Sequence, residues 1–243
     1  MSVLKLALTS SPQKNEHEGG GVSPLLFVLL LVTLLLPGCA SQVTDLGKVI
    51  SGAGTKGSRI QEFRTPSGIP IQWVQLNRVE NSNVTFYIEG DGDAYVSRTR
   101  PSKNPTPTNP LALNLALDDR SENVFYLARP CQFVPTGANR SCGSPVWTTE
   151  RFSPVFITAY EVLLNRIINE YDFRQVTLVG FSGGASIVLG VAPKVERLAL
   201  VKTVAGYIMR ASLNRSKGVP TNYAQTDPFS NIQNVVSIPQ VHF

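Results

Sequence analysis

Short apolar runs, bounded by Gly, Pro, Asn, Asp or Ser, recur along the chain from residue 69 onward. Runs of this length that are rich in Val, Ile, Phe and Tyr predict β-strands. Val84–Ile88 and Val124–Leu127 are almost continuously apolar, which is typical of strands buried on both faces of a sheet. The predicted strands are Ile71–Leu76, Val84–Ile88, Val124–Leu127, Val176–Val179, Thr203–Ala205 and Val235–Phe243.

Segments of helical character lie between these runs. In Ser153–Tyr171 the apolar residues recur near the helical period, and Ser153-Pro154 is a suitable helix start. Leu111–Leu117, after the Pro-rich loop Pro101–Pro110, and Gly184–Gly190 are apolar enough to form helices packed on a sheet. Strands that alternate with helices predict an α/β fold, in which a mostly parallel sheet has helices on both faces.

The most apolar segment, Leu25–Leu36, is about a dozen residues long, well short of the ~20 residues of a membrane-spanning helix. It is typical of a signal-peptide core. The residues at its end, Leu36-Pro37-Gly38-Cys39-Ala40, resemble the lipobox of bacterial lipoproteins, in which the cysteine is acylated and becomes the mature N-terminus. The resemblance implies a signal peptide over residues 1–38 and a lipid anchor on Cys39. Two alternatives stay open: an ordinary cysteine after a cleaved signal, or a buried helix.

The anchor implies a location in the bacterial cell envelope. In lipoproteins, a residue other than Asp after the cysteine favours sorting to the outer membrane, so Ala40 indicates a location at the periplasmic face or in the outer membrane. Residues 39–60 are rich in Gly, Ser and Thr and show no sustained apolar period, so we expect a flexible tether there. Residues 61–243 would then form one folded domain.

Composition narrows the class of protein. The chain is 42% hydrophobic and 16% charged, which is too apolar for a disordered protein or a nucleic-acid arm. The formal net charge is +5, but Lys and Arg are scattered singly. The densest group, Arg98, Arg100 and Lys103, lies in a Pro-rich stretch, where a solvated loop is favoured over a phosphate-binding patch. We therefore expect no nucleic-acid partner.

Two cysteines, Cys131 and Cys142, remain if Cys39 carries lipid. Disulfides persist in exported proteins, and the segment between the two cysteines contains Pro, Gly and Asn without periodicity. A disulfide between them is predicted to stabilise the fold by about 3 kcal/mol in the chain-entropy model. Two free thiols are the alternative.

Gly180-Phe181-Ser182-Gly183-Gly184 fits the pattern Gly-x-Ser-x-Gly. It lies between a predicted strand and a helix of small apolar residues, the setting of a nucleophile elbow. Serine is held there in a strained backbone conformation, and glycines allow close backbone approach. The pattern predicts Ser182 as a nucleophile beside a helix N-terminus that can stabilise an oxyanion. The alternative is a nucleotide-binding turn, but the Walker lysine and the dinucleotide fingerprint are both missing.

Together with this elbow, Tyr87-Ile88-Glu89-Gly90-Asp91-Gly92 resembles the α/β-hydrolases, in particular their exported bacterial members. In that family the loop after an early strand carries an oxyanion-hole amide, commonly after a His-Gly pair. The resemblance implies that Glu89-Gly90 replaces His-Gly, and that Asp91 and Gly183 donate the two backbone N–H groups. Three further residues, Trp147, Arg151 and Phe152, have two interpretations. They border an acyl pocket, or they pack in the core or at the surface, and the second interpretation is favoured.

The remaining polar residues predict neither a metal nor a cofactor. Asp91-Gly92-Asp93 begins like a calcium loop, but Tyr95 occupies the position of the next ligand. The chain has two histidines, His17 and His242, so there is no His cluster for zinc.

These features predict a membrane-anchored serine hydrolase, of esterase, lipase or peptidase type, for a small-molecule or lipid ester substrate. In the resembling family the acid follows a late strand and the histidine follows the final one. Val235–Phe243 looks like the strand before the acid, so we expect the final strand, the final helix and both catalytic partners to be missing and activity to be low. Asp227 precedes that strand and His242 lies within it, so neither fits. The alternative is a non-catalytic surface binding lipoprotein on a hydrolase fold.

Overall fold

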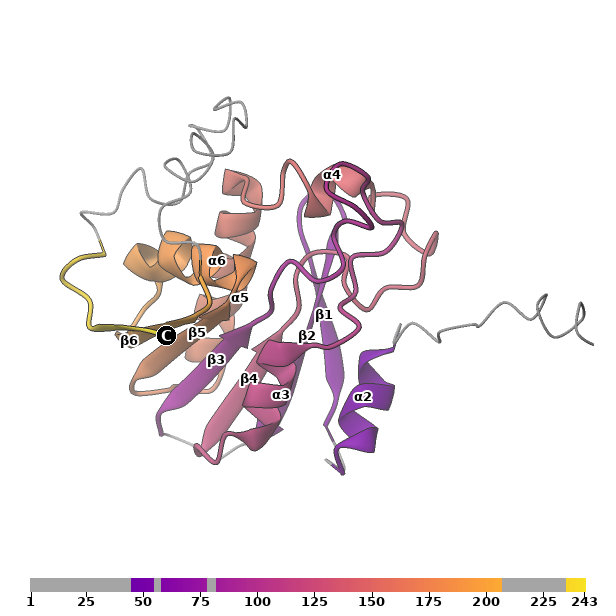
Figure 1. Ribbon diagram of the computed structural model, residues 1–243. Coiled ribbons are helices and arrows are strands. Elements are labelled where there is room, and N and C mark those ends of the chain that lie inside the picture. The colour runs from indigo at the N-terminus through magenta and orange to yellow at the C-terminus, as the bar shows by residue number, and fades with distance from the viewer. Residues whose placement is uncertain (1–44, 55–57, 78–81, 207–234) are drawn as a thin grey trace, which may run out of the picture. The chain divides into compact units, whose positions relative to one another are not determined.

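The computed structural model describes residues 45–54, 58–77, 82–206 and 235–243 (Figure 1). All of them belong to one compact unit, Gln42–Phe243. The predicted signal peptide over 1–38, Cys39, His17 and Asp227 lie outside the described residues.

Seven strands of the described residues form one sheet in the order β1-β2-β4-β3-β5-β6-β7. Strand β2 is antiparallel to both β1 and β4, and all other neighbours are parallel. The carboxyl ends of the parallel strands therefore meet at one edge of the sheet. The strands are β1 (Ile60–Arg64), β2 (Pro70–Asn77), β3 (Val84–Ile88), β4 (Asn123–Leu127), β5 (Val176–Phe181), β6 (Leu198–Val204) and β7 (Gln240–His242).

Helices cover both faces of this sheet, as Figure 1 shows. The helical elements are α2 (Leu46–Gly52), α3 (Leu111–Asp118), α4 (Ser144–Trp147), α5 (Pro154–Glu170), α6 (Gly183–Val191) and the 3₁₀ helix η1 (Ala192–Lys194). Helices α5 and α6 pack on one face, and α2 and α3 pack on the other.

Strand β4 shows why the sheet needs two layers of helices. Its side chains are buried on both faces: Phe125 and Leu127 join the core under α5 and α6, while Val124 and Tyr126 join the core under α2 and α3. Burial of each large apolar side chain contributes about 1.5–3 kcal/mol. The prediction of a mostly parallel sheet with helices on both faces is confirmed.

The tether predicted over 39–60 is wrong for Leu46–Gly52, which form helix α2. The Asp45 carboxylate caps the helix by accepting a hydrogen bond from the Gly47 N–H at 2.8 Å, and Leu46 and Ile50 are buried in the core under α2 and α3. Three apolar residues within one turn, Leu46, Val49 and Ile50, are too few to show a sustained period. Because so short a helix is not stable alone, its contacts with the domain stabilise it.

The ends of the sheet also differ from the prediction. Strand β1 was not predicted, although it pairs along its whole length with β2. The strand predicted over Val235–Phe243 is restricted to β7, because residues 235–237 form a turn before Pro239. No helix within the described ranges is long and apolar enough to cross a membrane.

Candidate active site

Ser182 lies at a sharp turn between β5 and α6, at the carboxyl edge of the sheet. Its φ of 50° and ψ of −113° fall outside the regions that L-residues favour, which costs about 1–3 kcal/mol. The Ser182 N–H donates to the Val204 carbonyl at 2.9 Å, so β6 helps to hold the turn. The predicted strand–turn–helix around Ser182 is confirmed.

The two outer glycines of the motif are required by close backbone contacts. A Cβ on Gly184 would lie 2.3 Å from the Ile88 carbonyl oxygen and 2.5 Å from that of Glu89. A Cβ on Gly180 would lie 2.5 Å from the Gly184 carbonyl oxygen. Backbone atoms at these positions cannot rotate aside as a side chain can. Glycine therefore lets the first turn of α6 pack directly on the ends of β3 and β5.

The loop Glu89–Gly92, here called the oxyanion loop, follows β3 and faces the elbow. Its Glu89 side chain is buried, with the residue only 1% exposed, and is surrounded by donors. The carboxylate accepts hydrogen bonds from the Gly90 N–H at 2.9 Å, the Ala112 and Leu113 N–H groups at 3.3 Å and the Tyr126 hydroxyl at 3.1 Å. It thus caps the N-terminus of α3 from a distant part of the chain.

Burial sets the titration behaviour of this carboxylate. It raises the pKa of Glu89, and the hydrogen bonds from Gly90, Ala112, Leu113 and Tyr126 oppose the rise. The pKa of Tyr126 is raised well above its ordinary value by burial and by the charge of Glu89. Tyr126 consequently remains protonated and donates to the carboxylate.

Gln132 joins the oxyanion loop to the segment after β4. Its Oε1 accepts from the Arg129 N–H at 2.9 Å, and its Nε2 donates to the Gly90 carbonyl at 3.0 Å. The disulfide between Cys131 and Cys142, whose Cα atoms are 5.8 Å apart, lies in the same segment. The predicted pairing is confirmed, and it fixes the segment that supplies both Arg129 and Gln132.

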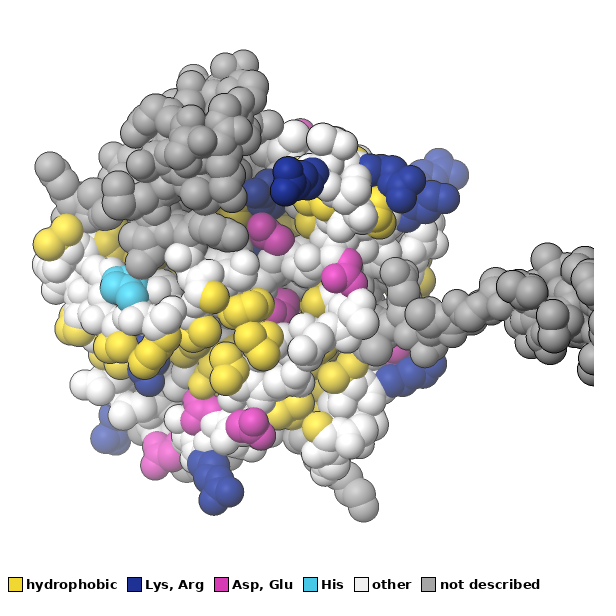
Figure 2. Space-filling view, in the orientation of Figure 1, with side chains coloured by type: hydrophobic (Ala, Val, Ile, Leu, Met, Phe, Trp, Pro, Cys, Tyr) yellow, Lys and Arg dark blue, Asp and Glu magenta, His cyan; other side chains and the backbone are white. Residues whose placement is uncertain are grey.

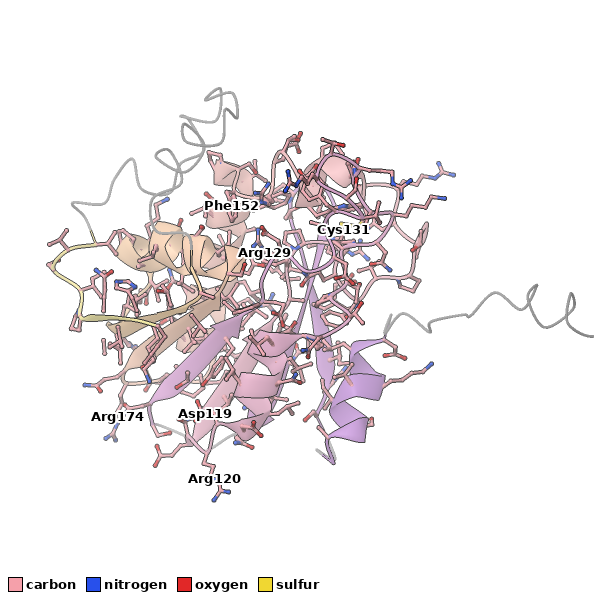
Figure 3. All side chains as sticks on the ribbon, in the orientation of Figure 1. Asp119, Arg120, Arg129, Cys131, Phe152 and Arg174 are labelled. Carbon is pink, nitrogen blue, oxygen red and sulfur yellow. A yellow bond between two sulfur atoms is a disulfide. The ribbon has the colours of Figure 1, made fainter. Side chains whose placement is uncertain are left out.

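The Asp91 side chain is held by two arginines. Its Oδ1 lies 3.1 Å from Nη1 of Arg129, and its Oδ2 lies 3.1 Å from Nε of Arg151. Arg129, whose side chain is 4% exposed, also donates to the Arg151 carbonyl at 2.6 Å. Both guanidinium groups lie over the ring of Phe152, at 5.1 and 4.8 Å from its centre. Figure 3 labels Arg129 and Phe152 at this end of the molecule.

Asp91 and Gly183, the two predicted oxyanion-hole residues, are brought into contact. A Cβ on Gly183 would lie 2.0 Å from Oδ1 of Asp91, so the carboxylate occupies the space that a side chain at position 183 would need. Neither the Asp91 nor the Gly183 backbone N–H forms a hydrogen bond within the described residues. Both amides are therefore available to a bound oxygen atom.

The partners of a serine nucleophile are not supplied by the described residues. Within them the Ser182 hydroxyl has no hydrogen-bond partner. His242 lies on β7, two strands from β5, where its Nδ1 and the Thr203 Oγ1 are 2.6 Å apart. His242 is itself exposed and pairs with the buried Thr203 of the neighbouring strand.

Sequence reasoning missed Arg129 and Gln132 and the capping role of Glu89. The available signal was position: Arg129 and Gln132 follow the apolar run Val124–Leu127 of β4 at the carboxyl edge, where α/β sheets place their binding residues. Trp147 and Phe152 are buried in the core, as the favoured interpretation of these residues expected. Among the described residues no three His, Cys, Asp or Glu side chains are arranged to hold a metal ion.

The loops at this edge also carry exposed charge. Figure 2 shows Lys and Arg side chains gathered over them. Arg98, Arg100 and Lys103 are exposed in the loop after the oxyanion loop. They lie on the surface, as a solvated loop requires.

No protein-family model and no curated protein matches the sequence. Among solved structures, an esterase from Pyrococcus furiosus is similar over 79% of this chain and 71% of its own, with 12% identity and a TM-score of 0.48. Brefeldin A esterase, a bacterial homologue of human hormone-sensitive lipase, is similar over 88% of this chain and 74% of its own, with 11% identity and a TM-score of 0.42. A serine hydrolase without a lid from Xanthomonas campestris is similar over 64% of each chain, with 14% identity and a TM-score of 0.41.

Similarities of this size do not bear on activity or substrate. The strand order, the antiparallel β2 and the strained serine between β5 and α6 are features of the chain itself. They give the α/β-hydrolase fold, with the Gly-x-Ser-x-Gly turn at the carboxyl edge of the sheet.

Proposed function

We propose that the protein is a serine hydrolase that cleaves carboxylic esters with Ser182 as nucleophile. The observation that supports this most is the strained Ser182, held at a strand–helix turn opposite a loop whose Asp91 N–H is available. A serine on an ordinary surface turn has no need of such a conformation. Strain of this kind concentrates at functional sites.

In the proposed reaction the Ser182 Oγ attacks the ester carbonyl carbon and loses its proton to a base. The carbonyl oxygen becomes an oxyanion that accepts hydrogen bonds from the N–H groups of Asp91 and Gly183. The tetrahedral species collapses, and the alcohol leaves with the proton from the base. Water then attacks the acyl-enzyme in the same way, which releases the acid and restores Ser182.

The base would have to come from outside the described residues. The printed sequence has only His17 and His242, and His242 is engaged with Thr203. We therefore expect the chain to turn over esters slowly. By analogy with triad deletions, the deficit would be on the order of 10⁴–10⁶ in rate.

Fluorophosphonate labelling followed by peptide mass spectrometry tests the nucleophile, with p-nitrophenyl acetate hydrolysis as the second readout. We expect a label on Ser182 and a slow hydrolysis that Ser182→Ala abolishes. Ser153→Ala is the matched control, because its side chain makes no capping hydrogen bond at the start of α5. Unchanged hydrolysis in Ser182→Ala would contradict the nucleophile, and turnover at ordinary enzyme rates would contradict the expected deficit.

A second candidate is a non-catalytic binding lipoprotein on the same fold. Within the described residues it is favoured by a Ser182 hydroxyl without a base. A protein of this kind would keep the fold but would not react covalently. Complete lack of fluorophosphonate labelling would support it.

We also propose that Cys39 is acylated and holds the domain at a bacterial membrane, on its periplasmic side. The lipobox-like residues around Cys39 support this. Helix α2 begins at Leu46, so the few intervening residues could extend by no more than about 25 Å, and the domain would stay close to the bilayer. Metabolic labelling with an alkyne fatty acid should mark the protein, and Cys39→Ser should remove the label and release the protein from membranes.

A further inference from the structure

The Asp91 carboxylate lies in a position that is unfavourable for the proposed chemistry. It contacts the backbone of Gly183, the residue after the nucleophile, and its own residue would donate one of the two oxyanion-hole N–H groups. A developing oxyanion at these two amides would therefore form beside an existing negative charge. Like charges at such separations repel strongly where water is partly excluded.

The two arginines around Asp91 offset this charge. Arg129 and Arg151 each contact a different carboxylate oxygen at 3.1 Å, so both oxygens are engaged. The Arg129 side chain is almost fully buried, and both guanidinium groups make cation–π contacts with the Phe152 ring. Two positive charges against one negative charge leave the cluster with a net charge of +1.

We propose that Arg129 and Arg151 are positioning residues that neutralise the Asp91 carboxylate beside Ser182, so that the Asp91 and Gly183 amides can stabilise an anion. The inference rests on the proposed function, because it assigns these amides to the oxyanion. It also explains an aspartate at this position. The carboxylate connects the oxyanion loop, through ion pairs, to the segments that carry Arg129 and Arg151. The second arginine makes the net charge of the cluster positive, so that the ion pairs do not disfavour an oxyanion.

The test separates charge from structure with two variants. Arg151→Gln reduces the net charge of the cluster from +1 to zero, whereas Asp91→Asn/Arg151→Gln restores +1 without the ion pair. The double variant keeps the other ties of the loop, including the Gln132 bond to Gly90 and the Glu89 cap. The probe is methylphosphonate, a tetrahedral anion, and the readout is the NMR shift of the Asp91 and Gly183 amides on titration.

We expect methylphosphonate to bind Arg151→Gln about tenfold more weakly than the unmodified chain, since one charge is removed at a partly exposed site. The double variant should recover to within about threefold, and Arg151→Lys, which keeps the charge, should do the same. Arg174→Gln is the matched control, because Arg174 is exposed and lies at the opposite end of the molecule in Figure 3. The rate of fluorophosphonate labelling at Ser182 should follow the same order.

Three results would overturn the proposal: an unchanged affinity in Arg151→Gln, a double variant as weak as the single one, or no shift of either amide in the unmodified chain. The proposed function fails separately. If the affinities of the variants for methylphosphonate follow the expected order but Ser182 is not labelled, the proposed role of the two arginines is supported and the hydrolase assignment is wrong. Amide spectra of each variant show beforehand whether it is folded. If Arg151→Gln is not folded, Asp91→Asn carries the test, because it raises the net charge of the cluster from +1 to +2 and should bind methylphosphonate more tightly; an unchanged affinity would overturn the proposal.

Discussion

The elbow around Ser182 and the oxyanion loop meet at one point of the sheet edge, but they are held in different ways. The elbow is fixed by backbone packing, through glycines at positions 180 and 184 that leave no room for a Cβ. The oxyanion loop is fixed by side chains from elsewhere in the chain. Glu89 caps α3, Gln132 holds the Gly90 carbonyl, and Arg129 and Arg151 hold Asp91.

This difference shows that one site can combine a segment fixed by backbone packing with a segment fixed by side-chain hydrogen bonds and ion pairs. A packed backbone turn has no room for a Cβ at its glycines but needs no partner beyond its neighbouring strands. A loop held by buried polar side chains depends on every partner being present, because each unpaired donor or acceptor costs about 1–3 kcal/mol. Substitutions should therefore act locally in the elbow and at a distance in the oxyanion loop.

Loss of the Glu89 carboxylate should have the largest effect. Glu89→Ala leaves three backbone N–H groups and the Tyr126 hydroxyl without an acceptor, so we expect a loss of about 4 kcal/mol in the free energy of unfolding. Urea denaturation measures it, with Glu122→Ala as control, since Glu122 is exposed. A loss no larger than that of the control would contradict the capping role.

Gly184→Ala tests the elbow. The added Cβ meets two carbonyl oxygens of the β3 end, so we expect a loss of about 3 kcal/mol and of all reaction at Ser182. Gly52→Ala is the matched control, because a Cβ there meets nothing within 4 Å. Thermal unfolding of both variants distinguishes a close contact at 184 from a general effect of removing glycine.

The disulfide should matter somewhat less to stability but should act on the oxyanion loop. The double variant Cys131→Ser/Cys142→Ser should lose between about 2 and 3 kcal/mol. Because Arg129 and Gln132 lie in the same segment, hydrogen exchange should increase at the hydrogen-bonded Gly90 amide, while the amides of β5 stay protected. Equal changes in both regions would show that the two loops are not held independently.

The smallest effect concerns pH. Burial raises the pKa of Glu89 in the folded state, so the folded protein binds more protons than the unfolded one over the window that begins near the ordinary carboxyl value of 4.5. The contribution of Glu89 to the free energy of unfolding is fully present below pH 4.5 and is lost as the pH rises through the pKa of Glu89 in the folded state. The stability of the unmodified chain relative to Glu89→Gln should therefore fall as pH rises from this value. Denaturation at a series of pH values measures the difference, and a rise would mean that the hydrogen bonds outweigh burial.

Local sequence determined the fold class and the elbow. Alternating apolar runs and helical segments predicted the two-faced sheet, and Gly-x-Ser-x-Gly after a strand predicted the strained turn, because strand burial, helix period and close glycine packing all act between near neighbours. The Cys131–Cys142 pair was also predicted, since only two cysteines remained in the domain.

Only the tertiary structure decided how the oxyanion loop is held. Nothing in the sequence near Glu89 shows that its carboxylate caps α3 more than twenty positions away, or that Arg129 and Arg151 share Asp91. The same holds for α2, whose two buried residues find their core only in the folded domain. Contacts of this kind depend on which strands become neighbours, and in this sheet β4 lies between β2 and β3, an order that no local pattern specifies.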